Sequence, residues 1–197
     1  MTGSAPQAQT DGRASRFEAI FSETYPRVLA YALRRAADRG AAEEVTAETY
    51  LVAWRRLEAM PEEPLPWLLG TARKVLANRR RATRRRQPGG PHAPLDLVDT
   101  PDPGTPTPEL VAEREAFANA FATLPERDRE VLSLTAWDGL EPREAALAMG
   151  CTAASFSLRL HRARRRLLKG LASHGHHLGE SRQSTAAPTP ARHREAS

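Results

Sequence analysis

Basic side chains gather in two short stretches of this 197-residue chain. Residues 73–86 contain eight Lys or Arg and no acid, and residues 156–170 contain six and no acid. These stretches hold 14 of the 29 basic residues, so the rest of the chain is acidic although the net charge is +5. Two cationic patches on an otherwise acidic protein favour contact with a polyanion. The alternative is a pair of solvated helix faces, although such faces usually mix both signs.

Catalytic chemistry has no comparable signal in the sequence. The chain contains no Gly-rich phosphate loop, nucleophile motif or metal-ligand spacing. Cys151 is the only cysteine, which excludes an intrachain disulfide and a cysteine-based metal cluster. Three histidines lie close together at 174, 176 and 177, but no carboxylate or thiol completes a cage around them. The sequence therefore predicts a binding protein without enzymatic activity, cofactor or metal site.

Hydropathy along the chain indicates a cytoplasmic protein. No apolar run approaches the roughly 20 residues that a membrane-spanning helix needs. Residues 1–16 are polar and lack the apolar core of a secretory signal peptide.

The apolar residues are mostly Leu, Ala and Val, which favours helix over strand. Helical spacing predicts an all-α protein with two small helical domains, at residues 15–86 and 109–172, and Gly40 is expected to end the first helical run. Residues 87–108 contain seven prolines, which cannot sustain a helix and predict a flexible linker. The polar segments 1–14 and 173–197 are expected to be disordered.

The most specific local pattern is a helix-turn-helix near the C-terminal end of the second domain. Pro142 is suited to the first turn of a helix, and Gly150 to the positive φ that ends it. Thr152 can cap the next helix, whose Phe156 and Leu160 share one face and point back to the first. Helix, tight turn and helix in this order predict a DNA-binding unit.

The second helix of this unit combines small or hydroxylic residues at its start with cations further along. In a helix-turn-helix the early turns approach base edges, and the later cations hold phosphates. An ordinary helical hairpin with a basic outer helix would look similar. The candidate DNA contacts are Thr152, Ser155, Ser157, Arg159, His161, Arg162 and Arg165.

The segment from Leu124 to Leu167 resembles region 4 of the extracytoplasmic-function (ECF) sigma factors, which belong to the sigma-70 family. The shared features are its Leu-Pro opening, the Gly139-Leu140 step and the closing run Arg159-Leu160-His161-Arg162. The resemblance implies that this domain reads the −35 element of a promoter. Ser157 stands where the family usually has a lysine.

Residues 17–86 are similar to region 2 of the same family, so both domains occur in the family order. The resemblance implies that the helix at residues 43–57 binds core RNA polymerase, and that the helix opened by Trp67 faces the −10 element. The implied polymerase contacts are Glu44, Glu48, Thr49 and Leu51. The implied −10 contacts are Arg73, Lys74, Asn78, Arg79 and Arg80.

Taken together, these patterns predict a sigma factor that directs transcription initiation, with core RNA polymerase, promoter DNA and an anti-sigma factor as the partners that the family implies. Two other interpretations remain open. One is a stand-alone helix-turn-helix regulator whose first domain dimerises or binds a ligand, and the other is an adaptor whose arginines contact RNA. The separate Arg-rich helix in the first domain favours the sigma factor, because a regulator needs no second DNA-facing patch.

Overall fold

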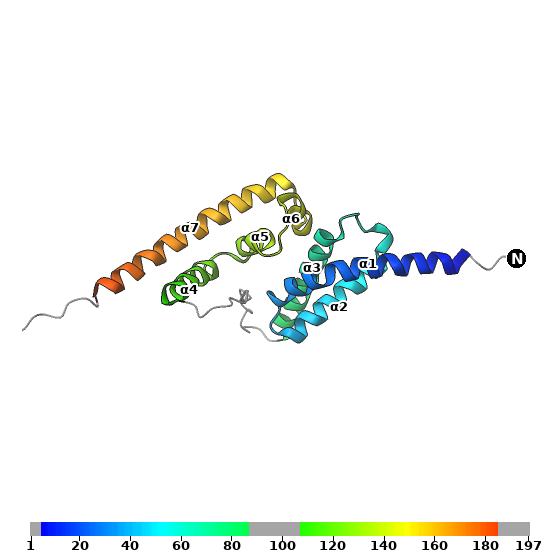
Figure 1. Cartoon of the computed structure of the whole chain (residues 1–197), viewed down its shortest axis with the longest axis horizontal. Helices are drawn as coiled ribbons and strands as arrows, with labels where there is room; N and C mark the ends of the chain where they lie inside the picture. The colour runs from blue at the N-terminus through cyan, green and yellow to red at the C-terminus, as the bar shows by residue number, and fades with distance from the viewer. Residues whose placement is uncertain (1–4, 87–106, 185–197) are drawn as a thin grey trace, which may run out of the picture.

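The computed structural model describes residues 5–86 and 107–184, and all regular structure within these ranges is helical. The first group of helices comprises α1 (Ala5–Leu33), α2 (Arg39–Arg55), the 3-10 helix η1 (Leu57–Ala59) and α3 (Pro64–Arg86). The second comprises α4 (Pro108–Ala122), α5 (Glu126–Ala136), α6 (Pro142–Met149) and α7 (Ala153–Ser184). The prediction of an all-α protein with two helical units is confirmed (Figure 1). Among the described helices, none has the length and apolar character needed to cross a membrane.

The first turn of α2 is set by a side-chain cap. The backbone N–H of Ala41 donates to Asp38 Oδ1 at 2.8 Å, which satisfies one of the unpaired amides at the helix start. The chain therefore turns between Leu33 and Arg39, and Gly40 lies inside α2. The expectation that Gly40 ends a helix is wrong, because the cap two residues earlier decides where α2 begins.

Helix extends further at both ends of the chain than the sequence predicts. α1 begins at Ala5, so residues 5–14 are helical and not disordered. α7 continues to Ser184, twelve residues past the predicted end of the second domain at 172. Alanine and glutamine favour helix in the first turns of α1, and no proline interrupts α7, since the next one is Pro188. The predicted linker lies outside the described residues, except for residues 107 and 108 at the start of α4.

The two groups of helices share one core. A single cluster of buried apolar residues includes members of α1, α2 and α3 as well as α5, α6 and α7. α3 crosses α6 at Gly70, where an added Cβ would lie only 3.0 Å from the carbonyl oxygen of Ala148. Because glycine alone lets the two backbones approach so closely, Gly70 allows direct packing of one group on the other.

Candidate nucleic-acid interface

Helices α6 and α7 form a helix-turn-helix. Pro142 occupies the first turn of α6, and the helix ends at Gly150 with φ of +64°. At the start of α7 the backbone N–H of Ser155 donates to Thr152 Oγ1 at 3.2 Å. Phe156 is fully buried beneath the motif. The turn, the cap and the buried face predicted from the sequence are confirmed.

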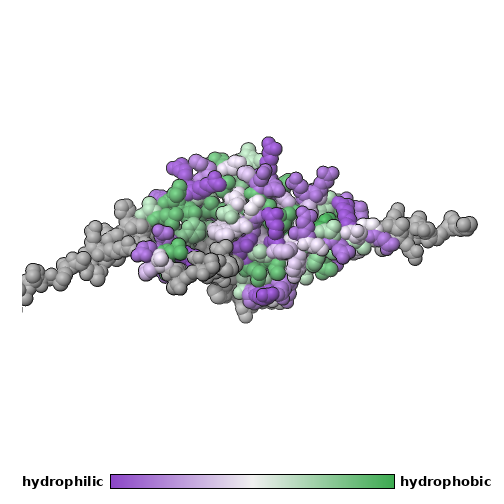
Figure 2. All heavy atoms as spheres, in the orientation of Figure 1, coloured by the Kyte–Doolittle hydropathy of each residue, from purple (hydrophilic) through white to green (hydrophobic). Residues whose placement is uncertain are grey.

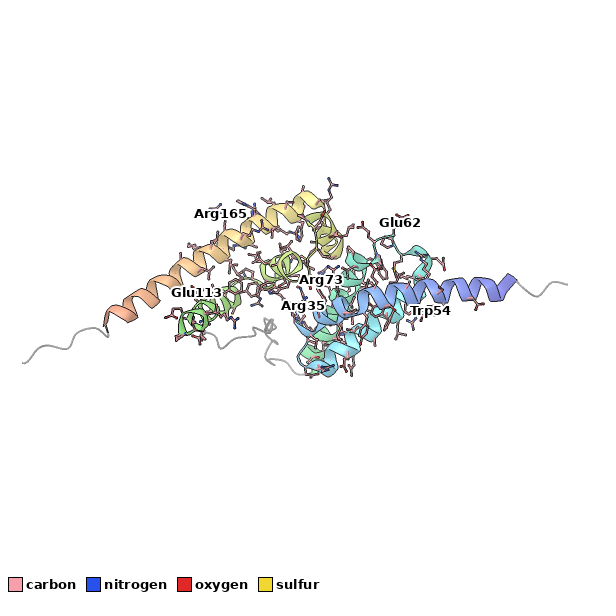
Figure 3. All side chains as sticks on the ribbon, in the orientation of Figure 1. Arg35, Trp54, Glu62, Arg73, Glu113 and Arg165 are labelled. Carbon is pink, nitrogen blue, oxygen red and sulfur yellow. The ribbon has the colours of Figure 1, made fainter. Side chains whose placement is uncertain are left out.

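The candidate DNA contacts of α7 lie mainly on its exposed surface. Arg165 lies on the outer side of α7, away from α4 and α5 (Figure 3), and hydrophilic side chains line the upper edge of the molecule, where α7 runs (Figure 2). Arg159 is half-buried and lines the contact with the first group of helices. Within the described residues, Arg159, Arg162 and Arg165 form no ion pair. The exposed candidates are Thr152, Ser155, Ser157, His161, Arg162 and Arg165.

The candidate DNA contacts on α3 divide into bonded and exposed residues. The guanidinium of Arg73 donates to the carbonyl oxygens of Ala148 and Met149 at 3.3 and 3.2 Å. These carbonyls end α6, where the negative pole of the helix dipole favours a cation. The neighbouring Lys74 and Asn78 are exposed instead. Arg73 therefore binds the helix-turn-helix itself, whereas Lys74 remains accessible.

Arg79 and Arg80 form ion pairs with different groups of helices. Arg79 bonds to Glu44 and to Glu48 on α2, the latter at 3.3 Å. The bond to Glu44 in particular raises the pKa of the Arg79 guanidinium further above its ordinary value. Arg80 pairs with Glu126 on α5. The structure thus joins a predicted promoter contact, Arg79, to two predicted polymerase contacts.

The outward face of α2 presents acids in its N-terminal half and apolar groups in its C-terminal half. Glu44, Glu48 and Leu51 follow one another at helical spacing, and Leu51 is 56% exposed. Trp54, 38% exposed, extends this face by one turn; sequence reasoning missed it, although its spacing from Leu51 could have found it. Thr49 does not belong to this face: it is fully buried, and its hydroxyl donates to the carbonyl four residues earlier at 2.8 Å.

Comparison with known families identifies both units. The family model of sigma-70 region 2 matches residues 20–86, and that of sigma-70 region 4 matches residues 114–167. The ECF RNA polymerase sigma factor SigL of Mycobacterium tuberculosis is 31% identical over 158 residues, which cover 78% of this chain and 88% of SigL. The chain belongs to the ECF sigma factors. It is therefore a sigma factor that binds core RNA polymerase and directs promoter recognition, with region 2 in α1–α3 and region 4 in α4–α7.

Further relatives agree with this assignment. The probable RNA polymerase sigma factor RfaY of Xanthomonas campestris pv. campestris is 33% identical over 143 residues, covering 70% of this chain and 36% of RfaY. RpoE of Bartonella quintana, solved with the anti-sigma factor NepR, shares the fold with a TM-score of 0.60 at 21% identity, over 79% of this chain and 96% of its own. CnrH, solved with the cytosolic domain of CnrY, gives 0.54 at 22% identity, over 80% and 88%.

An ion cluster joins the two regions of this sigma factor. Arg35 on the region 2 side donates to Glu130 Oε2 at 2.8 Å and to Asp138 Oδ2 at 3.0 Å. Arg34 also pairs with Asp138, and the Tyr31 hydroxyl donates to Glu130 Oε1 at 2.7 Å. We call Arg34, Arg35, Glu130 and Asp138 the interregion cluster. Sequence reasoning missed it, because its partners lie about a hundred residues apart and no local pattern links them.

The charged side chains of the interregion cluster are largely buried, which is unusual for ionised groups. Arg35 is only 3% exposed, and its side chain and that of Asp138 are almost wholly enclosed. Burial alone would lower the pKa of Arg35, but Tyr31, Glu130 and Asp138 outweigh it and raise the pKa. The guanidinium is therefore charged under all ordinary conditions and depends on the acids of region 4 for compensation. Figure 3 places Arg35 and Arg73 together between the two groups of helices.

Proposed function

We propose that the outward face of α2 contacts core RNA polymerase through Glu44, Glu48 and Leu51, with Trp54 as an additional apolar contact. Acids on an exposed helix steer association with a basic partner surface, and the apolar groups beside them add affinity when they are buried. Thr49 is excluded from this contact, because its side chain is enclosed in region 2.

We propose that promoter DNA binds two separate surfaces. Region 4 reads the −35 element with the start of α7, and region 2 reads the −10 element with α3. The observation that carries this proposal concerns Arg159, Arg162 and Arg165 on α7, which form no ion pair within the described residues. The −35 surface comprises Thr152, Ser155, Ser157, Arg159, His161, Arg162 and Arg165. The −10 surface comprises Arg73, Lys74, Asn78, Arg79 and Arg80.

An anti-sigma factor completes the proposed set of partners. RpoE of Bartonella quintana was solved with its anti-sigma factor, and CnrH was solved with the cytosolic domain of CnrY. Both have the fold of this chain, which supports a partner of the same kind here. Core polymerase and promoter DNA are cytoplasmic in bacteria, so we propose that the protein acts in the cytoplasm.

Co-elution with bacterial core RNA polymerase on a sizing column tests the proposal. The wild type should form a stable complex that initiates at discrete sites on a library of genomic fragments. The double variant Glu44→Lys/Glu48→Lys should bind polymerase more weakly. The matched control is Glu113→Lys/Glu115→Lys, which makes the same charge change on the exposed surface of α4.

The outcomes separate the competing functions. If the control variant weakened the complex as much as the α2 variant does, α2 would not be the polymerase contact. A wild type that ignores core polymerase but shifts specific DNA fragments would instead be a stand-alone regulator. Steeply salt-dependent binding to RNA without sequence preference would favour the adaptor.

A further inference from the structure

The −10 surface proposed above is partly covered by region 4. Arg73 is bonded to the end of α6, and Arg80 is paired with Glu126 of α5. Both arginines line a cavity of about 360 Å³ between the regions, together with Arg159 of α7. A space of this size suits a small molecule and cannot admit a DNA strand with its neighbouring nucleotides. In this arrangement two of the −10 cations are held by groups of region 4.

The interregion cluster holds region 4 in this covering position. All of its cations belong to the region 2 side and all of its acids to region 4, so no member finds its ion-pair partner within its own region. A further bond runs the same way, from the Arg27 guanidinium to the carbonyl oxygen of Asp138 at 2.6 Å. Removing one side of a buried ion pair leaves an uncompensated charge, which strongly disfavours the packed state.

Close backbone packing adds a second, independent element. At Gly70 the backbone of α3 touches that of α6, and any side chain there would meet the carbonyl oxygen and Cα of Ala148 at 3.0 and 3.2 Å. Backbone atoms cannot move aside as the tip of a flexible side chain can. A methyl group at this position would therefore push the two regions apart without changing any charge.

We propose that the interregion cluster and the Gly70 contact form a latch that keeps the free sigma factor closed, with Arg73 and Arg80 withheld from DNA until region 4 moves away. This inference rests on the proposed role of α3 at the −10 element. The two parts of the latch act differently. The ion pairs of the interregion cluster stabilise one arrangement of the two regions, and the absence of a side chain at Gly70 leaves room for that arrangement. Polymerase and promoter then act on the open form, whose population the latch limits.

Two variants test the latch on the full chain by different means. Glu130→Gln/Asp138→Asn removes the acids of the cluster, and Glu113→Gln/Glu115→Gln is its control, with the same charge change on exposed residues. Gly70→Ala adds one methyl group at the contact. Its control is Gly12→Ala on α1, where an added Cβ meets nothing within 4 Å. Circular dichroism verifies that each variant retains its helices.

Small-angle X-ray scattering and DNA binding provide the two readouts. Both latch variants should have a larger radius of gyration than the wild type, and both controls should match it. The salt dependence of binding to a single-stranded DNA oligonucleotide should steepen by roughly 1.4 in log–log slope, about 0.7 for each of two phosphates newly held by Arg73 and Arg80.

The results distinguish failure of the latch from failure of the proposed function. Unchanged dimensions in both variants would overturn the latch. Expansion without a steeper salt slope would show that the closed form withholds no cations, which also overturns it. If the wild type fails to initiate with core polymerase, the proposed function fails, whereas the scattering result still reports on the closed arrangement.

Discussion

The two Arg-rich helices α3 and α7 look alike in sequence but differ in what their cations contact. On α3, Arg73 and Arg80 bind region 4, and Arg79 binds the acids of α2. On α7, Arg162 and Arg165 are exposed and form no ion pair within the described residues. A run of arginines therefore indicates affinity for anions, but whether those arginines are available depends on acids and carbonyls that lie far away in the sequence.

The two promoter surfaces therefore differ in how accessible their cations are in the closed form. Region 4 presents Arg162 and Arg165 to solvent in the closed form, so these two cations need no rearrangement before they bind DNA. In region 2, Arg73, Arg79 and Arg80 have to exchange internal partners for phosphates, so each of their bonds to DNA replaces one within the protein and adds less net free energy. We infer that region 4 dominates DNA binding by the free protein, and that region 2 contributes fully only after the regions separate.

The largest effect is expected on α7. Arg162→Ala/Arg165→Ala should weaken binding of the free protein to duplex DNA and reduce its log–log salt slope by roughly 1.8, about 0.9 for each phosphate that these arginines no longer neutralise. Electrophoretic or fluorescence titrations across a salt series measure this slope. Arg55→Ala/Arg56→Ala is the control, because it removes two exposed arginines of region 2. An equal reduction in the control would mean that net charge, and not the α7 surface, governs binding.

A smaller and more selective effect is expected on α3. In the free protein, Lys74→Ala should lower the salt slope for single-stranded DNA by roughly 0.7, because Lys74 is exposed. Arg73→Ala should leave that slope unchanged, because Arg73 is bonded to α6. With core polymerase, both variants should initiate less well than the wild type. Equal slopes for the two free variants would contradict the difference between bonded and exposed cations.

Replacing Arg79 is expected to change polymerase binding and initiation modestly and in opposite directions. Removing this cation frees Glu44 and Glu48 and makes α2 more negative, so Arg79→Ala should bind core polymerase up to about five-fold more tightly; exposed ion pairs rarely contribute more than about 1 kcal/mol. Initiation should nevertheless fall, because the variant lacks a proposed −10 residue. Binding is measured by titration of labelled polymerase, and initiation by run-off transcription. Weaker binding would show that Arg79 itself supports the polymerase contact.

Local chemistry explains which parts of the structure could be predicted from sequence. Pro142, Gly150 and Thr152 act through backbone preferences and caps within a few residues, so the helix-turn-helix was predictable in detail. Helical spacing likewise predicted the two units. These features depend on neighbours along the chain, which the sequence displays directly.

Features that depend on distant partners could not be predicted. Thr49 was assigned to the polymerase contact by resemblance, yet its direction depends on the packing of α2 against its neighbours, which buries it completely. Arg35 gave no signal because its acids lie about a hundred residues away. Nor does composition exclude helix in residues 5–14 or 173–184, where helices extend beyond the predicted domains.

The smallest expected effect is a loss of folding stability at high pH that originates in region 2. All three tyrosines of the chain lie in region 2, and burial raises the pKa of Tyr50 to about 12. The Thr24 hydroxyl donates to the Ile20 carbonyl at 2.6 Å, so Tyr50 must supply the proton of its 2.8 Å bond to Thr24. The unfolded chain loses this proton near pH 10, before the folded protein does, and stability therefore falls between about pH 10 and 12.

At about pH 11 the deprotonation of Tyr50 in the unfolded chain should lower the free energy of unfolding by about 1 kcal/mol. Urea unfolding of the full chain at about pH 9 and pH 11 measures this decrease, and Tyr50→Phe should reduce the difference between the two pH values. Tyr31, whose pKa is raised first by burial and then by Glu130, contributes to the remaining difference. An unchanged difference in Tyr50→Phe would rule out Tyr50 as a source of this pH dependence. Because region 4 contains no tyrosine, the tyrosine-linked destabilisation begins on the region 2 side, and it also reaches the latch through Tyr31.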